Sequence, residues 1–112
     1  MCKCESLEGN TVTVFVTPTT FPFVSPMIQP IKVPTCIVWK IIGPDERLRF
    51  DPGSIVIKDP GNNFGTPTLS DDCLSICIED HCLGTKDHSY CYDLYFAGNR
   101  VPIDPSIDNE PH

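Results

Sequence analysis

Residues 72–98 read DCLSICIEDHCLGTKDHSYCYDLYFAG, and this stretch decides the fold class. Apolar and polar residues alternate along two segments of it, a pattern typical of strands that bury one face. The apolar rows are Leu74, Ile76 and Ile78 in the first segment, and Tyr90, Tyr92, Leu94 and Phe96 in the second. A polar loop around Gly84 separates the segments, so the sequence predicts an antiparallel hairpin at 73–96 in the core of the domain.

The register of this hairpin follows from its two apolar rows. Folding the chain about Gly84 sets the rows against each other, and a slip of one residue would move them to opposite faces. The same register places Cys77 opposite Cys91 on the other face, with Cβ atoms about 4.5–5.5 Å apart. Three interpretations stay open for this pair: two thiols, a cross-strand disulfide, or part of a metal site.

Strand patterns recur along the rest of the chain. The sequence predicts a strand at 11–17 with its valines on one face, and a central strand at 36–42. Shorter strands are expected at 47–50, 54–58 and 64–70, and a hairpin turn at Gly98-Asn99. No segment has a helical period, and strands at this spacing are typical of a sandwich.

Residues 17–35 are extended because five prolines recur at every fourth position. Apolar residues lie between them, including Phe21, Phe23 and Ile28. The segment is therefore expected either to pack as an irregular edge strand or to offer an apolar surface to a partner.

We predict an all-β fold: a single Ig-like antiparallel β-sandwich, with the Pro-rich extended segment at 17–35. One domain would span 1–112, with 1–10 and 106–112 as candidate flexible tails. The prolines of the C-terminal tail limit it to an edge strand or a docked extended arm. The Ig-like assignment depends on Trp39 in a central strand, followed by Tyr90 and Tyr92 as candidates for a tyrosine corner.

Recurrent acidic-proline dipeptides suggest a relationship. They are Asp51-Pro52, Asp59-Pro60, Asp104-Pro105 and Glu110-Pro111. With the VWKI segment at 38–41, they make residues 36–111 resemble the DP-EP family of small bacterial proteins. The resemblance implies a small β-sandwich and no particular activity. In physical terms the aspartate caps a turn and the proline stops the strand.

Composition narrows the classes of partner. A formal net charge of −7 makes nucleic acid and anionic membranes poor partners. No apolar run reaches the roughly 20 residues of a membrane helix, and no secretory signal is visible, so a cytoplasmic location is expected. The remaining candidate is a protein partner or a second copy, bound through residues 18–34.

Seven cysteines make thiol chemistry the main candidate for a site. In a reducing compartment most are expected to be thiols or metal ligands. Cys2 and Cys4 lie on a terminus expected to be frayed. The best metal cluster combines Cys77, Cys91 and Cys82, with His81 as a further ligand.

Other chemistries have weaker support. A Cys/His nucleophile in the 81–88 loop would lack a water-excluding pocket, and the acidic groups at 71–72, 79–80 and 104–110 lack EF-hand spacing. We therefore expect a non-catalytic binding or assembly module that carries no cofactor. The alternative is a thiol-based metal-binding or redox-responsive protein using Cys77, Cys82 and Cys91.

Overall fold

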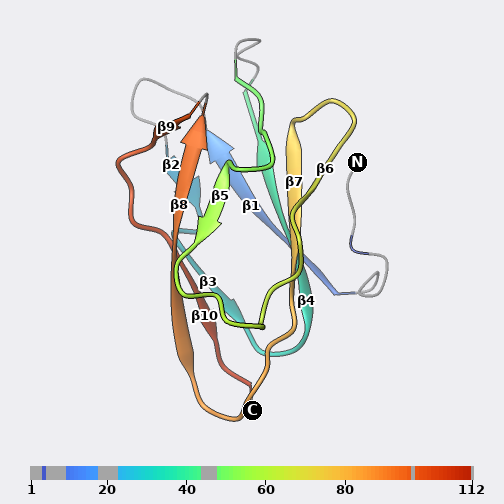
Figure 1. Ribbon diagram of the computed structural model, residues 1–112, viewed down its shortest axis with the longest axis vertical. Coiled ribbons are helices and arrows are strands. Elements are labelled where there is room, and N and C mark those ends of the chain that lie inside the picture. The colour runs from blue at the N-terminus through green and yellow to red at the C-terminus, as the bar shows by residue number, and fades with distance from the viewer. Residues whose placement is uncertain (1–3, 5–9, 18–22, 44–47, 97, 112) are drawn as a thin grey trace.

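Two β-sheets face each other in the computed structural model of the chain, so the fold is an all-β sandwich (Figure 1). The structure describes all residues except 1–3, 5–9, 18–22, 44–47, 97 and 112. In these described residues no helix is long and apolar enough to cross a membrane.

The first sheet has the strand order β2-β1-β4-β7-β6. Its members are β1 (Thr11–Thr17), β2 (Phe23–Ser25), β4 (Thr35–Ile41), β6 (Thr68–Leu69) and β7 (Ser75–Asp80). β1 and β4 are parallel, and the other neighbours are antiparallel. The predicted strand at 36–42 is therefore confirmed as the central strand, β4.

The second sheet has the strand order β3-β10-β8-β5, and β9 forms a short hairpin with β8. Its members are β3 (Ile28–Ile31), β5 (Ile55–Ile57), β8 (His88–Phe96), β9 (Asn99–Arg100) and β10 (Ser106–Asn109). β3 and β10 are parallel. Both sheets are thus mixed, and the purely antiparallel arrangement that we predicted is wrong.

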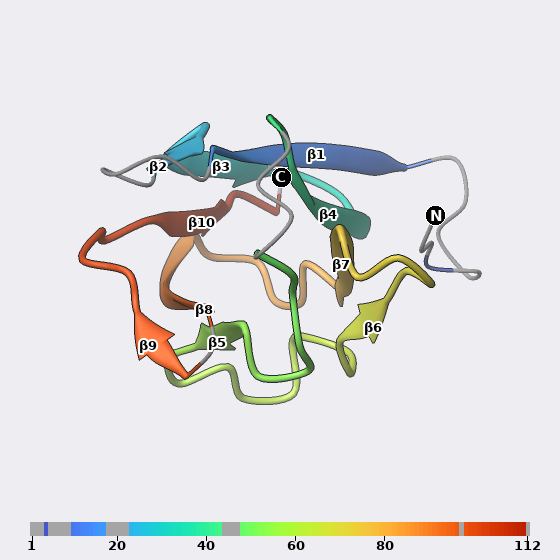
Figure 2. The same cartoon turned by 90° about the horizontal axis from the view of Figure 1, so that it is seen from above.

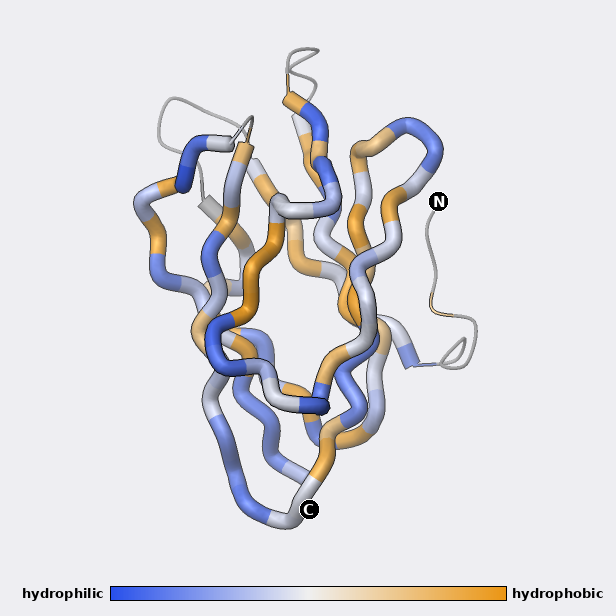
Figure 3. Tube along the Cα trace, viewed as in Figure 1, coloured by the Kyte–Doolittle hydropathy of each residue, from blue (hydrophilic) through white to orange (hydrophobic). Residues whose placement is uncertain are grey.

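The facing sides of the two sheets form the core, and Figure 2 shows β10, β8 and β5 opposite the curved first sheet. Val14, Val16, Ile37, Trp39, Ile76, Ile78, Tyr92 and Leu94 are all buried there, and the last four belong to the two apolar rows that the sequence predicts as buried. The indole Nε1 of Trp39 donates a 3.0 Å hydrogen bond to the Tyr92 hydroxyl across the sandwich. Burial raises the pKa of Tyr92 to about 12. In Figure 3 hydrophobic and hydrophilic residues alternate along the strands, and the part of the loop that leads into β8 is hydrophilic.

The predicted 73–96 hairpin is wrong, although both of its strands exist. β7 pairs with β4 and β6 in the first sheet, whereas β8 pairs with β10, β5 and β9 in the second. The intervening loop crosses from one sheet to the other. The apolar rows of the two strands do face each other, but across the sandwich instead of side by side. Alternation identifies the inward face of a strand and leaves its neighbour undetermined.

Two further expectations are corrected. Residues 106–109 are not a flexible tail or an edge strand, because β10 lies between β3 and β8. The expected strand at 47–50 is irregular over its described residues. Phe50 is nevertheless buried there, stacked on Phe96 with ring centroids 5.7 Å apart.

The Pro-rich segment supplies an edge strand to each sheet, which confirms its predicted packing at an edge. β2 ends the first sheet next to β1, and β3 ends the second next to β10. The chain passes between the sheets at the Ser25-Pro26 bond. Residues 18–22 lie outside the described part of the chain.

The first acidic-proline dipeptide behaves as its chemistry predicts. The Asp51 carboxylate accepts a 2.8 Å hydrogen bond from the backbone N–H of Gly53. The Asp51 carbonyl accepts another, of 3.0 Å, from the N–H of Ser54. This turn brings the chain into β5, so the dipeptide has a structural role that needs no ligand.

Asp80 is a fully buried carboxylate that joins the two sheets. Its Oδ1 accepts hydrogen bonds from the side chains of Asn63 and Asn109, at 3.0 and 2.9 Å, and from the N–H of Cys82 at 2.9 Å. Its Oδ2 and the Oδ1 of Asn109 are both buried, and neither has a hydrogen-bond partner among the described residues. A proton on Asp80 would let Oδ2 act as a donor, and burial raises the pKa of this carboxyl accordingly.

This raised pKa predicts a pH-dependent stability. Asp80 protonates more readily in the folded chain than at its ordinary pKa of 3.8, so its contribution is largest in acid and falls as pH rises through the folded pKa. We expect Asp80→Asn to flatten this fall in the free energy of unfolding. The measurement is urea unfolding over a pH series above about 4. Asp71→Asn, at an exposed position, is the matched control, and an unchanged pH profile in Asp80→Asn would contradict the assignment.

Candidate functional site: a cluster of three cysteines

Three cysteine sulfurs meet on the outer face of the first sheet. Cys4 and Cys36 form a disulfide, with Cα atoms 5.6 Å apart. The Sγ of Cys77 joins them, and all three sulfurs lie within 4.8 Å of one another. Among the described residues, this is the only group of three or more cysteine, histidine or acidic side chains close enough to hold a metal ion.

The strands β4 and β7 set two of the three positions. Both strands turn one row of residues toward the core, so the residues between them face outward. In this antiparallel pair Val38 is the partner of Cys77, and Cys36 is the partner of Glu79. Cys36 and Cys77 are therefore diagonal neighbours on one face. With Val38 they form a small second core beneath Cys4.

Cys4 supplies the third sulfur, and for this residue our expectation of a frayed position is wrong. Cys4 is only 6% exposed and covers the outer face of β4 and β7. The carbonyl of Asn10 accepts a 2.8 Å hydrogen bond from the N–H of Cys36, so Asn10 also lies beside that residue. Cys2 lies outside the described part of the chain.

The predicted cluster around Cys77 and Cys91 is not assembled. Cys77 is buried on the outer face of the first sheet, whereas Cys91 is exposed on the outer face of the second, where its partner is Ser106. Packed sheets lie about 10 Å apart. The two residues thus lie on opposite sides of the sandwich, because β7 and β8 are not a hairpin.

The other two predicted metal ligands, Cys82 and His81, are not part of the three-cysteine group either. Cys82 is buried, and its Sγ lies 3.7 Å from the carbonyl oxygen of Ile31, to which it donates. Burial and the nearby Asp80 raise the pKa of Cys82, so it stays a thiol. The His81 side chain is 39% exposed and lies 3.8 Å from the Glu79 carboxylate.

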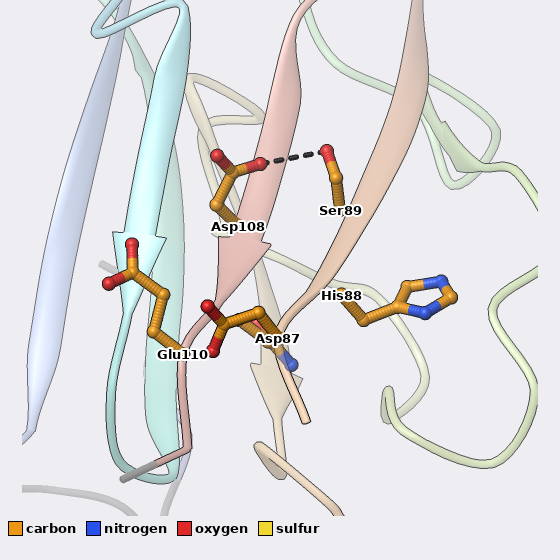
Figure 4. Close-up of a pocket in the computed structure, with 6 residues that line it drawn as sticks. Asp87, His88, Ser89, Asp108 and Glu110 are labelled. Carbon is orange, nitrogen blue, oxygen red and sulfur yellow. Dashed lines mark hydrogen bonds between the residues drawn. The ribbon is translucent and has the colours of Figure 1, made fainter. Parts of the chain in front are cut away.

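An acidic hollow of about 190 Å³ lies at the end of the sandwich near the C-terminus (Figure 4). Asp87, Asp108 and Glu110 line it, and Asp108 accepts a 2.8 Å hydrogen bond from Ser89. His88 points away from these carboxylates in Figure 4.

A larger hollow of about 300 Å³, lined by Ile55, Val56, Phe64 and several prolines, lies between β5 and β7.

No protein-family model matches this sequence, and no curated protein does. The relationship to the DP-EP family therefore stays a prediction from the dipeptides and the VWKI segment. The chemistry of the site is accordingly inferred from its own geometry.

The disulfide should contribute substantially to stability. It joins residues 32 positions apart, and the chain-entropy model gives about 3–4 kcal/mol for a loop of this length. We expect Cys4→Ser to lower the free energy of unfolding by roughly that amount in urea titrations without reductant. Cys91→Ser, at an exposed thiol, is the matched control. If wild type and Cys4→Ser unfold at the same urea concentration, the disulfide is absent in solution.

Proposed function

We propose that the protein is a redox-responsive β-sandwich module without catalytic activity, and that Cys4, Cys36 and Cys77 are its responsive site. The observation that carries the proposal is the position of the Cys77 sulfur within 4.8 Å of both sulfurs of a disulfide. A thiolate this close is placed to attack the disulfide.

The exchange needs no outside reagent. The Cys77 thiol gives up its proton, and its sulfur attacks the Sγ of Cys4. A Cys4–Cys77 bond forms, the Cys4–Cys36 bond breaks, and Cys36 leaves as a thiolate that takes the proton. Full reduction is a different step, in which a dithiol supplies two electrons and leaves three thiols.

Geometry favours Cys4 as the residue that changes partner. Cys36 and Cys77 are fixed on neighbouring strands, and diagonal neighbours have Cα atoms about 7–8 Å apart. Disulfides usually need less than about 6.8 Å. Cys4 lies outside any strand, so it can reach either residue. Exchange therefore shifts the bond of Cys4 from β4 to β7 without a net change of oxidation state, and reduction by a dithiol releases Cys4 from both strands.

Disulfide mapping tests this proposal. Unreduced protein is incubated at mildly alkaline pH, quenched with acid, alkylated, digested and analysed by mass spectrometry. We expect Cys4–Cys36 together with a Cys4–Cys77 population. The Cys77→Ser variant should give Cys4–Cys36 alone, and Cys91→Ser should match the wild type. The proposal would be refuted if Cys4 of the wild-type protein is fully alkylated, or if it is bonded only to a cysteine other than Cys36 and Cys77.

A second candidate function is assembly through the Pro-rich segment, supported by its exposed apolar residues. Met27, Ile28 and Val33 are 41, 57 and 53% exposed. They lie in or beside β3, which is an edge strand of its sheet in the described chain. An edge strand with apolar side chains is suited to a second copy or a protein partner.

Assembly makes a separate prediction. Burying one such side chain stabilises an interface by about 1.5–3 kcal/mol, so Ile28→Ser should raise the dissociation constant of a dimer at least tenfold. Sedimentation velocity over a concentration series measures this constant. Val56→Ser, a similarly exposed change on β5, is the control. A wild-type protein that is monomeric at every concentration would exclude self-assembly.

A further inference from the structure

The three-cysteine cluster has a second chemistry once its disulfide is reduced. We propose that the reduced sulfurs of Cys4, Cys36 and Cys77 bind one thiophilic d¹⁰ metal ion, such as Zn²⁺, Cd²⁺ or Cu⁺. This inference rests on the proposed function only in requiring that the Cys4–Cys36 bond can be reduced.

The spacing of the sulfurs fits a metal. Zinc–sulfur bonds are about 2.3 Å long, so two thiolates on one tetrahedral ion lie about 3.8 Å apart. The three sulfurs already lie within 4.8 Å of one another. Reduction releases the close pair, so Cys4 and Cys36 can separate to the distance that an ion requires. Cys77 then needs only a small approach.

The chemistry of the donors determines the class of ion. In the described chain the group contains sulfur ligands alone, without imidazole or carboxylate. Soft thiolates select Zn²⁺, Cd²⁺ and Cu⁺ over Mg²⁺ and Ca²⁺. The site is buried around Val38, where three negative thiolates would be unfavourable without a cation. A water molecule would complete a tetrahedron.

The supporting strands favour a defined site. Cys36 and Cys77 lie on β4 and β7, which are paired through six residues on each strand. The metal would hold the third ligand, Cys4, in the place that the disulfide holds in the oxidised protein. The N-terminal segment would thus be attached to the sheet in both states, by a covalent bond or by an ion.

Cadmium titration tests the site. The full chain is reduced with a phosphine, freed of reductant without oxygen, and titrated with Cd²⁺ alone. We expect one ion per chain by native mass spectrometry and a near-ultraviolet thiolate-to-metal absorption. Cys77→Ser should weaken binding at least tenfold, since one of three ligands is lost. Cys91→Ser should bind like the wild type, and oxidised protein should not bind at this site.

Alkylation of the wild-type protein gives a readout that does not depend on the folding of a variant. Bound Cd²⁺ should protect Cys4, Cys36 and Cys77 from alkylation and leave Cys91 reactive. Absence of binding, or equal binding by Cys77→Ser, would overturn the metal site. If the mapping finds Cys4 bonded to neither Cys36 nor Cys77, while Cd²⁺ still protects the three cysteines, the redox proposal is refuted and the metal site is supported.

Discussion

Burial of β4 on both of its faces is the constraint on which the rest of the structure depends. Its inward side chains, Ile37 and Trp39, pack into the sandwich, where the indole of Trp39 donates to Tyr92 of the opposite sheet. Two of its outward side chains, Cys36 and Val38, are buried with Cys77 and Cys4, whereas Lys40 at the end of the strand is exposed. One face of the strand therefore joins the two sheets, and the other face forms the candidate site.

The two-sided burial also explains why the strand has so few polar residues. A strand between two neighbours in a sheet, covered on both faces, favours a continuous apolar run. Cysteine fits such a place because it behaves as a small apolar residue when buried. The same three cysteines are buried against one another and Val38, so each sulfur has the other two as its nearest reactive groups. Packing and chemistry thus use the same side chains.

Much of the fold was predictable because alternation reports which side of each strand is inward. The apolar rows of β7 and β8 and the valine row of β1 do lie on the inward faces of their strands. The neighbours were not, because apolar rows that match across a hairpin match equally well across a sandwich. That ambiguity produced the incorrect pairing of β7 with β8, and hence of Cys77 with Cys91. The parallel neighbours β1 and β4 also left no local signal, since β2 and β3 lie between them in sequence and belong to different sheets.

The site was only partly predictable for the same reason. Cys36 and Cys77 both occupy outward positions of strands that are otherwise apolar, and the sequence shows this parity. It does not show that the two strands are adjacent. Cys4 has no periodic pattern around it, so nothing local marks it as buried. Its contact with β4 is set by tertiary packing alone.

The disulfide also determines how the molecule would carry mechanical tension. Cys4 and Cys36 close a loop that contains β1, β2 and β3. A force pulling on the two ends of the oxidised chain would pass from Cys4 directly into β4. The Pro-rich segment and its neighbouring strands would carry none of that load. After reduction, and without a bound metal ion, the same force would enter at β1, so the state of one site decides whether residues 4–36 can be extended.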